Sequence, residues 1–298
     1  MDIENLIDHH HLADNINHNI ARHAKQYEVH KIKEKQSDRS SYSSVKGKGE
    51  KSKQKAKCNV KVDYSEPGTI EDMSLVETLK LVFNITHLCP QRNEAFSPAI
   101  SNILRLILMC HVLPDQPMEP PMSQLINALM NLELEANASA LFPRSDPKAF
   151  TERMIDLLDL ATTAYPERNL ERQVAPILLL MRKVYSLAPR QVKIHMRALL
   201  LPTADDRAQP LGKTDTLSCR IPRLSTSPLT PTVRKELSSL LFEMSDKDAI
   251  DFVQNVGYGF SSGLLFQLNV QVSDNALEAW STSDTGSVTE RTKHGSSK

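Results

Sequence analysis

The chain has 298 residues and carries 36 basic and 36 acidic side chains, so its formal net charge at pH 7 is zero. Its apolar runs are far shorter than the roughly 20 residues that a membrane-spanning helix needs. The four cysteines show no C-x-x-C spacing and follow no apolar leader: Cys58, Cys89, Cys110 and Cys219. These features argue against a membrane-spanning, zinc-binding or secreted protein, and we expect reduced thiols in a soluble cytoplasmic chain.

The first 71 residues divide into two predicted segments. Residues 1–27 form a weak helical segment with loosely periodic apolar positions, and residues 28–71 form a basic linker. From Lys31 to Lys61 we count eleven basic and three acidic residues, with few large apolar ones. Such a stretch cannot repay the entropy of ordering, so we predict a disordered, solvated linker. Contact with nucleic acid or an anionic membrane is the alternative.

Histidines in the first segment suggest a metal site. His9, His10 and His11 are consecutive, and His18 and His23 follow them. No carboxylate or thiol arrangement around them defines a coordination geometry. We therefore predict that no metal is bound.

Residues 72–269 form a succession of amphipathic helical segments. Predicted helices begin near residues 74, 98, 121, 147, 168, 190, 215, 231, 246 and 259. The clearest apolar stripe comprises Leu170, Val174, Ile177, Leu178, Met181 and Tyr185. The mean spacing fits armadillo and HEAT repeats better than tetratricopeptide repeats, and strand signals are scarce. The pattern predicts an all-α, armadillo/HEAT-like α-solenoid superhelix, followed by a flexible Ser- and Thr-rich tail at 270–298.

The last part of this domain has the plainest helix boundaries. One predicted helix begins near residue 231 and presents a single apolar face. Ser245 is the predicted N-cap of the next helix, with Asp248 as its capping-box partner. Gly257 is predicted to end that helix, because glycine readily takes the positive φ of a helix C-terminus.

No arrangement of residues predicts a catalytic site. Gly257, Gly259 and Gly263 resemble part of a nucleotide-binding loop, but no buried strand precedes them and the third glycine is one position late. The chain has no P-loop motif, no H-E-x-x-H motif and no spacing typical of a Ser, His and Asp triad. We predict a protein that is not an enzyme and needs no cofactor.

Four polar residues in the helical segments are candidates for partner binding. Asn84 and Asn131 lie in Leu-rich helices, where an amide is costly to bury unless it is hydrogen-bonded. In armadillo-like repeats such asparagines often hold the backbone of a bound segment. Arg105 and Arg182 could add positive charge to the same groove. The alternatives are amides satisfied within their own repeat and ordinary exposed arginines.

Several stretches resemble the fungal synembryns: NHNIARHAKQY, DMSLVETLKLVFNITHLCP, LINALMNLELE, LLPTADDRAQPLGKTDTLSCRIPRLSTSPLTP, LLFEMSDKDAIDFVQNVGYGFSSGLLFQLNV and VSDNALEAWS. Synembryns are non-receptor guanine nucleotide exchange factors and folding chaperones of heterotrimeric G-protein α subunits, built as armadillo-type superhelices. Residues 72–282 look like the second half of the longer family members. We therefore expect the amino-terminal repeats to be missing.

The resemblance implies an exchange factor and chaperone that binds the nucleotide-free α subunit. The family's groove grips the carboxyl-terminal helix of that subunit, and holding this helix displaced favours release of GDP. The implied protein is a monomer of the cytoplasm or cell cortex that has no nucleic-acid partner. A passive solenoid adaptor that docks a linear peptide, and a truncated form without exchange activity, are the alternatives.

The tail contains two predicted phosphorylation sites. Ser281 and Ser287 are each followed three residues later by an acid, Asp284 and Glu290. Acid-directed kinases favour this spacing. Phosphorylation would add about −1.5 to −2 charges per site and could dock the tail on a basic surface.

Overall fold

The fold was analysed in a computed structural model that describes residues 3–43, 70–207 and 215–270. All regular elements in these ranges are helices, apart from one isolated β-bridge between Leu113 and Gln116. Mutual packing of successive helices is typical of an α-solenoid. The predicted all-α fold is therefore confirmed.

The helices begin close to the positions that apolar periodicity predicts. Their bounds are α1 (Ile3–His9), α2 (Leu12–Ser43), α3 (Ile70–Leu88), the 3-10 helix η1 (Pro90–Phe96), α4 (Ser97–Met109), α5 (Met122–Met130), α6 (Ala138–Leu141), α7 (Ala149–Ala164), α8 (Glu167–Leu187), α9 (Arg190–Leu200), α10 (Ala204–Arg207), α11 (Leu217–Leu224), α12 (Pro231–Met244), α13 (Ala249–Val256) and α14 (Tyr258–Gln267). The largest difference between a predicted and an observed start is 74 against 70 for α3. The chain forms two compact units, Met1–Leu160 and Ala161–Lys298.

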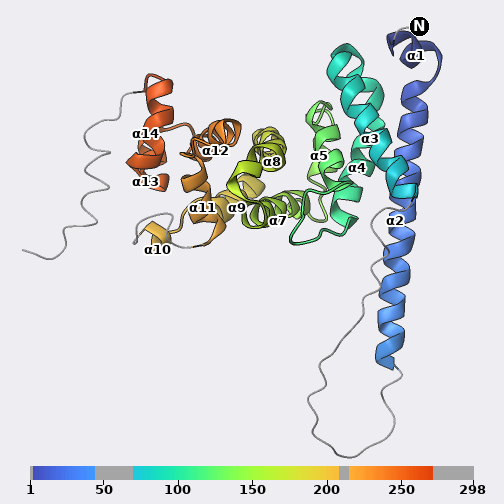
Figure 1. Ribbon diagram of the computed structural model, residues 1–298, viewed down its shortest axis with the longest axis horizontal. Coiled ribbons are helices and arrows are strands. Elements are labelled where there is room, and N and C mark those ends of the chain that lie inside the picture. The colour runs from blue at the N-terminus through green and yellow to red at the C-terminus, as the bar shows by residue number, and fades with distance from the viewer. Residues whose placement is uncertain (1–2, 44–69, 208–214, 271–298) are drawn as a thin grey trace, which may run out of the picture. The chain divides into compact units, whose positions relative to one another are not determined.

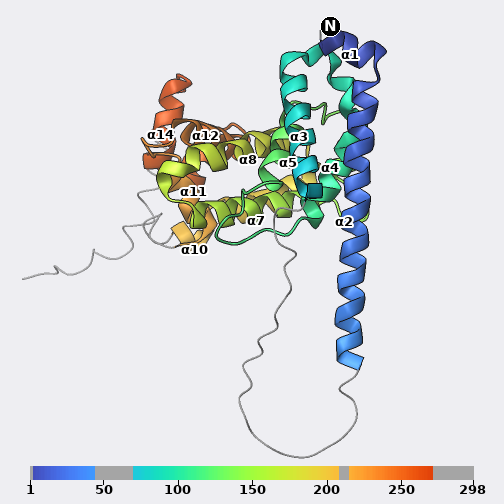
Figure 2. The same cartoon turned by 45° about the vertical axis from the view of Figure 1, so that its right-hand side comes forward.

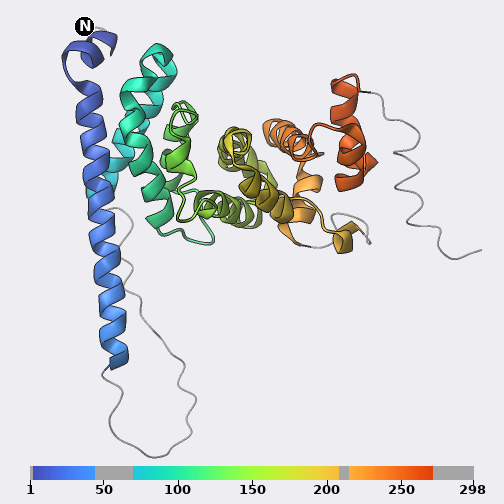
Figure 3. The same ribbon diagram turned by 180° about the vertical axis from the view of Figure 1, so that it is seen from behind.

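The long helix α2 of the first unit packs against α3 and α4 (Figures 1 and 3). Its buried face carries Ala13, Ile16, Ile20 and Ala24, which recur every three or four residues. This helix corrects two predictions. Residues 1–27 are not a weak segment, because their apolar face is buried in the core of the unit.

Residues 28–43, which we assigned to a disordered linker, continue α2. Lys, Glu and Gln are good helix formers, so a basic segment can extend a helix that tertiary packing has already stabilised. The rest of the predicted linker, 44–69, lies outside the described residues.

The second unit is built on the contact between α8 and α12, with α11, α13 and α14 around it (Figure 2). The predicted stripe of α8 is buried, and so are the predicted apolar residues of α12: Val233, Leu237, Leu240, Leu241 and Met244. Burial of each such side chain stabilises the fold by roughly 1.5–3 kcal/mol relative to exposure. These two helices therefore form the core of this unit.

Caps at the end of the second unit differ from the prediction in one respect. Asp248, and not Ser245, is the N-cap of α13, because its carboxylate accepts hydrogen bonds from the backbone N–H groups of Ile250 and Asp251 at 2.8 and 2.9 Å. Ser245 is the C-cap of α12. Gly257 ends α13 with φ = 83°, as predicted.

In the described ranges, no helix is long and apolar enough to cross a membrane. No group of three or more His, Cys, Asp and Glu side chains within those same ranges could hold a metal ion.

Candidate partner-binding site

The two predicted asparagines have different environments in the first unit. Asn84 is exposed on α3. Asn131, the C-cap of α5, donates from Nδ2 to the carbonyl of Phe83 at 3.3 Å and to Oγ1 of Thr86 at 3.4 Å. Its own carbonyl accepts a 2.7 Å hydrogen bond from Asn93. Asn131 therefore joins α5 to α3. Its amide is hydrogen-bonded within the helical stack, which corresponds to the alternative to partner binding given above.

Arg105 is also engaged within the first unit. Its guanidinium forms an ion pair with Glu28 of α2 and donates to Oδ1 of Asn102 at 3.2 Å. Both members of the ion pair remain about 40% exposed, with values of 43% and 40%. The contact joins α4 to α2, and it pairs Arg105 with a carboxylate of its own unit.

Arg182 lies on α8 in the second unit and bonds two carboxylates of α12. It forms an ion pair with Glu236, whose side chain is only 5% exposed, and another with Glu243 at 2.5 Å. Burial by itself lowers the pKa of Arg182, but the hydrogen bonds to Glu243 and Glu236 outweigh burial and raise it. The guanidinium therefore stays charged, and its two ion pairs link α8 to α12.

A second arginine organises the adjoining turn. Arg197 of α9 donates to the hydroxyl of Tyr185 at 2.7 Å and forms a bidentate ion pair with Asp246, one bond of which is 2.8 Å. Hydrogen bonding to Arg197 lowers the pKa of Asp246. Burial raises the pKa of Tyr185, so its hydroxyl stays neutral at physiological pH. Asp246 and Lys247 both have positive φ, 54° and 59°, and the ion pair holds this turn in place.

The second unit also contains a basic hollow of about 520 Å³, lined by Arg182, Lys183, Tyr185, Ser186, Lys193, Glu243 and Lys247. Lys193 lies 5.4 Å from the centre of the Tyr185 ring and donates to the carbonyl of Ser186 at 3.1 Å. The lining holds four cationic side chains and one carboxylate, and that carboxylate is bonded to Arg182. The hollow is therefore suited to receive acidic groups of a partner.

Of this lining, sequence reasoning identified only Arg182. Lys183 is its neighbour, but Lys193 comes from α9 and Lys247 from the turn after α12. No periodicity along one helix connects residues that converge from three elements. The positive φ of Asp246 and Lys247 is visible only in the structure, so it gave no signal in the sequence.

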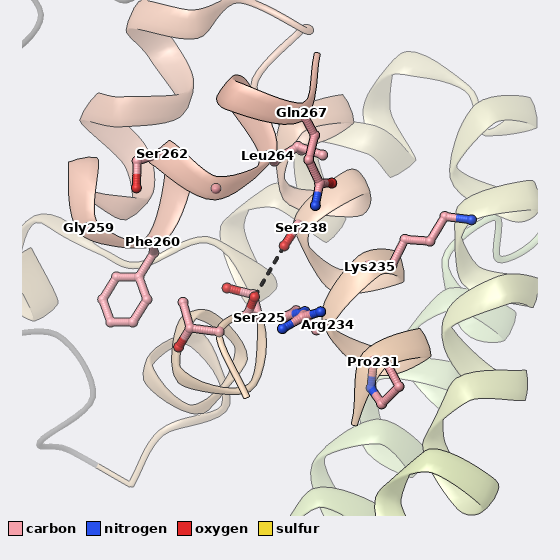
Figure 4. A pocket seen from close by; sticks show the side chains of 12 residues that line it. Ser225, Pro231, Arg234, Lys235, Ser238, Gly259, Phe260, Ser262, Leu264 and Gln267 are labelled. Atoms are coloured by element: carbon pink, nitrogen blue, oxygen red, sulfur yellow. Dashed lines mark hydrogen bonds between the residues drawn. The ribbon is translucent and has the colours of Figure 1, made fainter. Parts of the chain in front are cut away.

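A second hollow, of about 490 Å³, lies between α12 and α14 in the same unit (Figure 4). We call it the α12–α14 hollow; its lining includes Arg234, Lys235 and Ser238 of α12, Gly259, Phe260, Gly263, Leu264 and Gln267 of α14, and Ser225 near α11. Ser238 donates to the carbonyl of Ser225 at 3.3 Å across its floor. A Cβ atom added to either glycine would meet no atom within 4 Å, so the α14 wall faces open space.

The predicted binding residues do not form one cluster. Asn84, Arg105 and Asn131 belong to the first unit, where they lie on three different helices or caps, and Arg182 belongs to the second. The predicted phosphorylation sites Ser281 and Ser287 lie outside the described residues.

Comparison with known proteins decides the family. The family model for the guanine nucleotide exchange factor synembryn matches residues 1–298. The chain belongs to the synembryn family. It is also 25% identical over 205 residues to a synembryn-like chaperone of Schizosaccharomyces pombe, a match that covers 65% of this chain and 37% of that protein. This synembryn chain therefore spans little more than a third of the relative that it matches.

Proposed function

We propose that this synembryn chain promotes nucleotide exchange on heterotrimeric G-protein α subunits and assists their folding. The family match over residues 1–298 is the observation that carries the proposal. The similarity to a chaperone supports the folding role. Helical stacks of this kind commonly act by binding, through extended surfaces that no single repeat provides.

The mechanism rests on thermodynamic linkage. A protein that binds the nucleotide-free α subunit more tightly than the GDP-bound form must weaken GDP binding by the same factor. GDP then dissociates and GTP enters when the complex separates. The same preference protects partly folded α subunits from aggregation and degradation, because binding increases the fraction of α subunits that are in the complex.

The basic hollow is the surface that we assign to the α subunit. Its lysines, Lys183, Lys193 and Lys247, are offset by a single carboxylate that Arg182 already bonds. Acidic groups of the partner would therefore meet a lining in which cationic side chains outnumber carboxylates. Charges at the rim of an interface chiefly accelerate association and select the partner.

The proposal is tested by measuring release of labelled GDP from a purified α subunit, together with a binding titration. The Lys183→Glu and Lys193→Glu double variant should bind roughly tenfold more weakly, which corresponds to about 1.4 kcal/mol, and should release GDP more slowly. The matched control reverses two exposed charges of the first unit, Lys25→Glu and Arg144→Glu, and should behave like the unmodified chain.

The outcomes separate the rival functions. Binding that leaves GDP release unchanged would identify a passive adaptor. No binding by the unmodified chain would identify a form without exchange activity. Equal losses in the control and the lysine variant would show that the basic hollow is not the binding surface.

A further inference from the structure

The last helix of the second unit is only partly covered. Ser261 and Leu265 are the only buried residues of α14, through which it packs on α13 and α12. Phe260 and Leu264 line the α12–α14 hollow and remain partly exposed. Exposed apolar side chains that gather beside a hollow often mark an interaction site.

We propose that residues 275–280 of the same chain, with the sequence NALEAW, dock in the α12–α14 hollow. The sequence itself has a helix-start signal, since Asn275 precedes Glu278 by three residues as in a capping box. Leu277 and Trp280 are also three residues apart, so one helical turn would present both on the same side. This segment is therefore able to offer one apolar face to Phe260 and Leu264.

Charge favours the same placement. The hollow carries Arg234 and Lys235 on its α12 wall, both exposed. The docking segment has Glu278 between its two apolar residues, and Asp274 precedes it. The segment would place its apolar side chains against α14 and its acidic side chains against the basic residues of α12.

The chain between α14 and the docking segment is long enough for the segment to reach the α12–α14 hollow. Leu277 lies seven positions after Val270, and an extended chain of seven residue steps spans up to roughly 23–25 Å. Helix α14 has 10 residues and is therefore about 15 Å long. A tethered segment also has an effective concentration in the millimolar range, which favours it over a second copy of the chain.

The chain contains a single tryptophan, Trp280, which reports directly on the contact. In the unmodified chain we expect blue-shifted Trp280 emission and protection from acrylamide quenching. Gly263→Leu places a branched side chain in the hollow, and its Cβ meets no atom within 4 Å. This variant should shift the emission to the red and raise quenching to the level of the urea-unfolded chain, with the helical circular dichroism unchanged.

The matched control is Phe266→Ser, which changes an apolar side chain on α14 that is 84% exposed and lies outside the hollow. It should leave the emission unchanged. A charge swap adds a second measurement: Arg234→Glu and Glu278→Lys should each increase quenching, and the double variant should restore protection.

Three results would overturn the proposal. The first is an unmodified chain whose Trp280 is as accessible as in urea. The second is an emission shift with Phe266→Ser but none with Gly263→Leu, which would place the segment elsewhere. The third is protection that disappears on dilution or arises only when an α subunit is added, since the occupant would then be another molecule.

Discussion

Two ion pairs, one in each unit, differ in how far they are withdrawn from water. The side chains of Arg105 and Glu28 are 43% and 40% exposed, whereas those of Arg182 and Glu236 are 29% and 5% exposed. Exposed pairs typically contribute about 0–1 kcal/mol, but a buried carboxylate that loses its partner is left without compensation. The same chemical pair is therefore a minor contact in the first unit and a structural requirement in the second.

The largest effect is expected from Arg182→Ala. This change leaves the buried Glu236 without its cation, so the second unit should lose about 3–5 kcal/mol of unfolding free energy. Urea denaturation followed by circular dichroism measures this loss. Any accompanying loss of partner binding would then reflect unfolding rather than a missing contact.

Arg182→Met combined with Glu236→Met is the matched control. Replacing both members of a buried pair by apolar residues of similar size is often neutral or stabilising. The double variant should therefore recover most of the stability. Glu243 also loses its cation in this variant, but its side chain is 21% exposed and can be hydrated. A loss as large as that of Arg182→Ala would show that burial of Glu236 does not set the cost.

A smaller effect is expected from Asn131→Ala in the first unit. The change removes the hydrogen bonds to Phe83 and Thr86, and it should lower the unfolding free energy by about 1 kcal/mol. Asn84→Ala, at an exposed position of α3, should change it by less than about 0.5 kcal/mol. Similar values for the two variants would contradict the assignment of Asn131 as the link between α5 and α3.

Most of the helices could be predicted from the sequence because a buried face imposes its period on the chain. Leu170, Val174 and Ile177 recur along α8 and are all buried. The same reasoning understated α2, since its buried positions include two alanines, which carry little hydrophobic signal. Reasoning from the sequence also assigned the N-cap of α13 to Ser245 instead of Asp248. Two residues with positive φ, Asp246 and Lys247, separate that serine from the observed cap.

The candidate site was largely beyond such reasoning. Periodicity shows that Arg182 is not part of the apolar stripe, but it cannot show that Glu236 and Glu243 approach from a helix about 60 residues later. The lysines of the basic hollow converge in the same way from separate elements. Long-range pairing of charges depends on how helices stack, and single-helix patterns do not contain that information.

The exposed pair of the first unit completes the comparison. Arg105→Ala should lower stability by only about 0.2–1 kcal/mol, since both charges are already hydrated. The difference between this variant and the unmodified chain should shrink further at high salt, which screens exposed charges. Denaturation at low and high ionic strength measures both expectations. A loss as large as that of Arg182→Ala would contradict the role assigned to burial.

The smallest effect concerns the ion pair between Asp246 and Arg197, because the Asp246 side chain is 67% exposed. The hydrogen bond from Arg197 lowers the folded pKa of Asp246 below the value of about 3.9 that an unfolded chain gives. Because the folded pKa is the lower of the two, the stabilisation by this ion pair is fully present above the unfolded pKa. It is lost as the pH falls through the folded pKa.

Asp246→Asn isolates this contribution. Asparagine tolerates the positive φ of 54° at this position, so the change removes the charge with little backbone strain. The variant should be slightly less stable than the unmodified chain at neutral pH. The difference should begin to narrow as the pH falls below about 4, the unfolded pKa, and should disappear only below the lowered folded pKa of Asp246. Thermal unfolding from pH 7 to pH 3 measures the difference. A gap that stays constant over this range would show that the carboxylate stabilises the turn by packing and not through its charge.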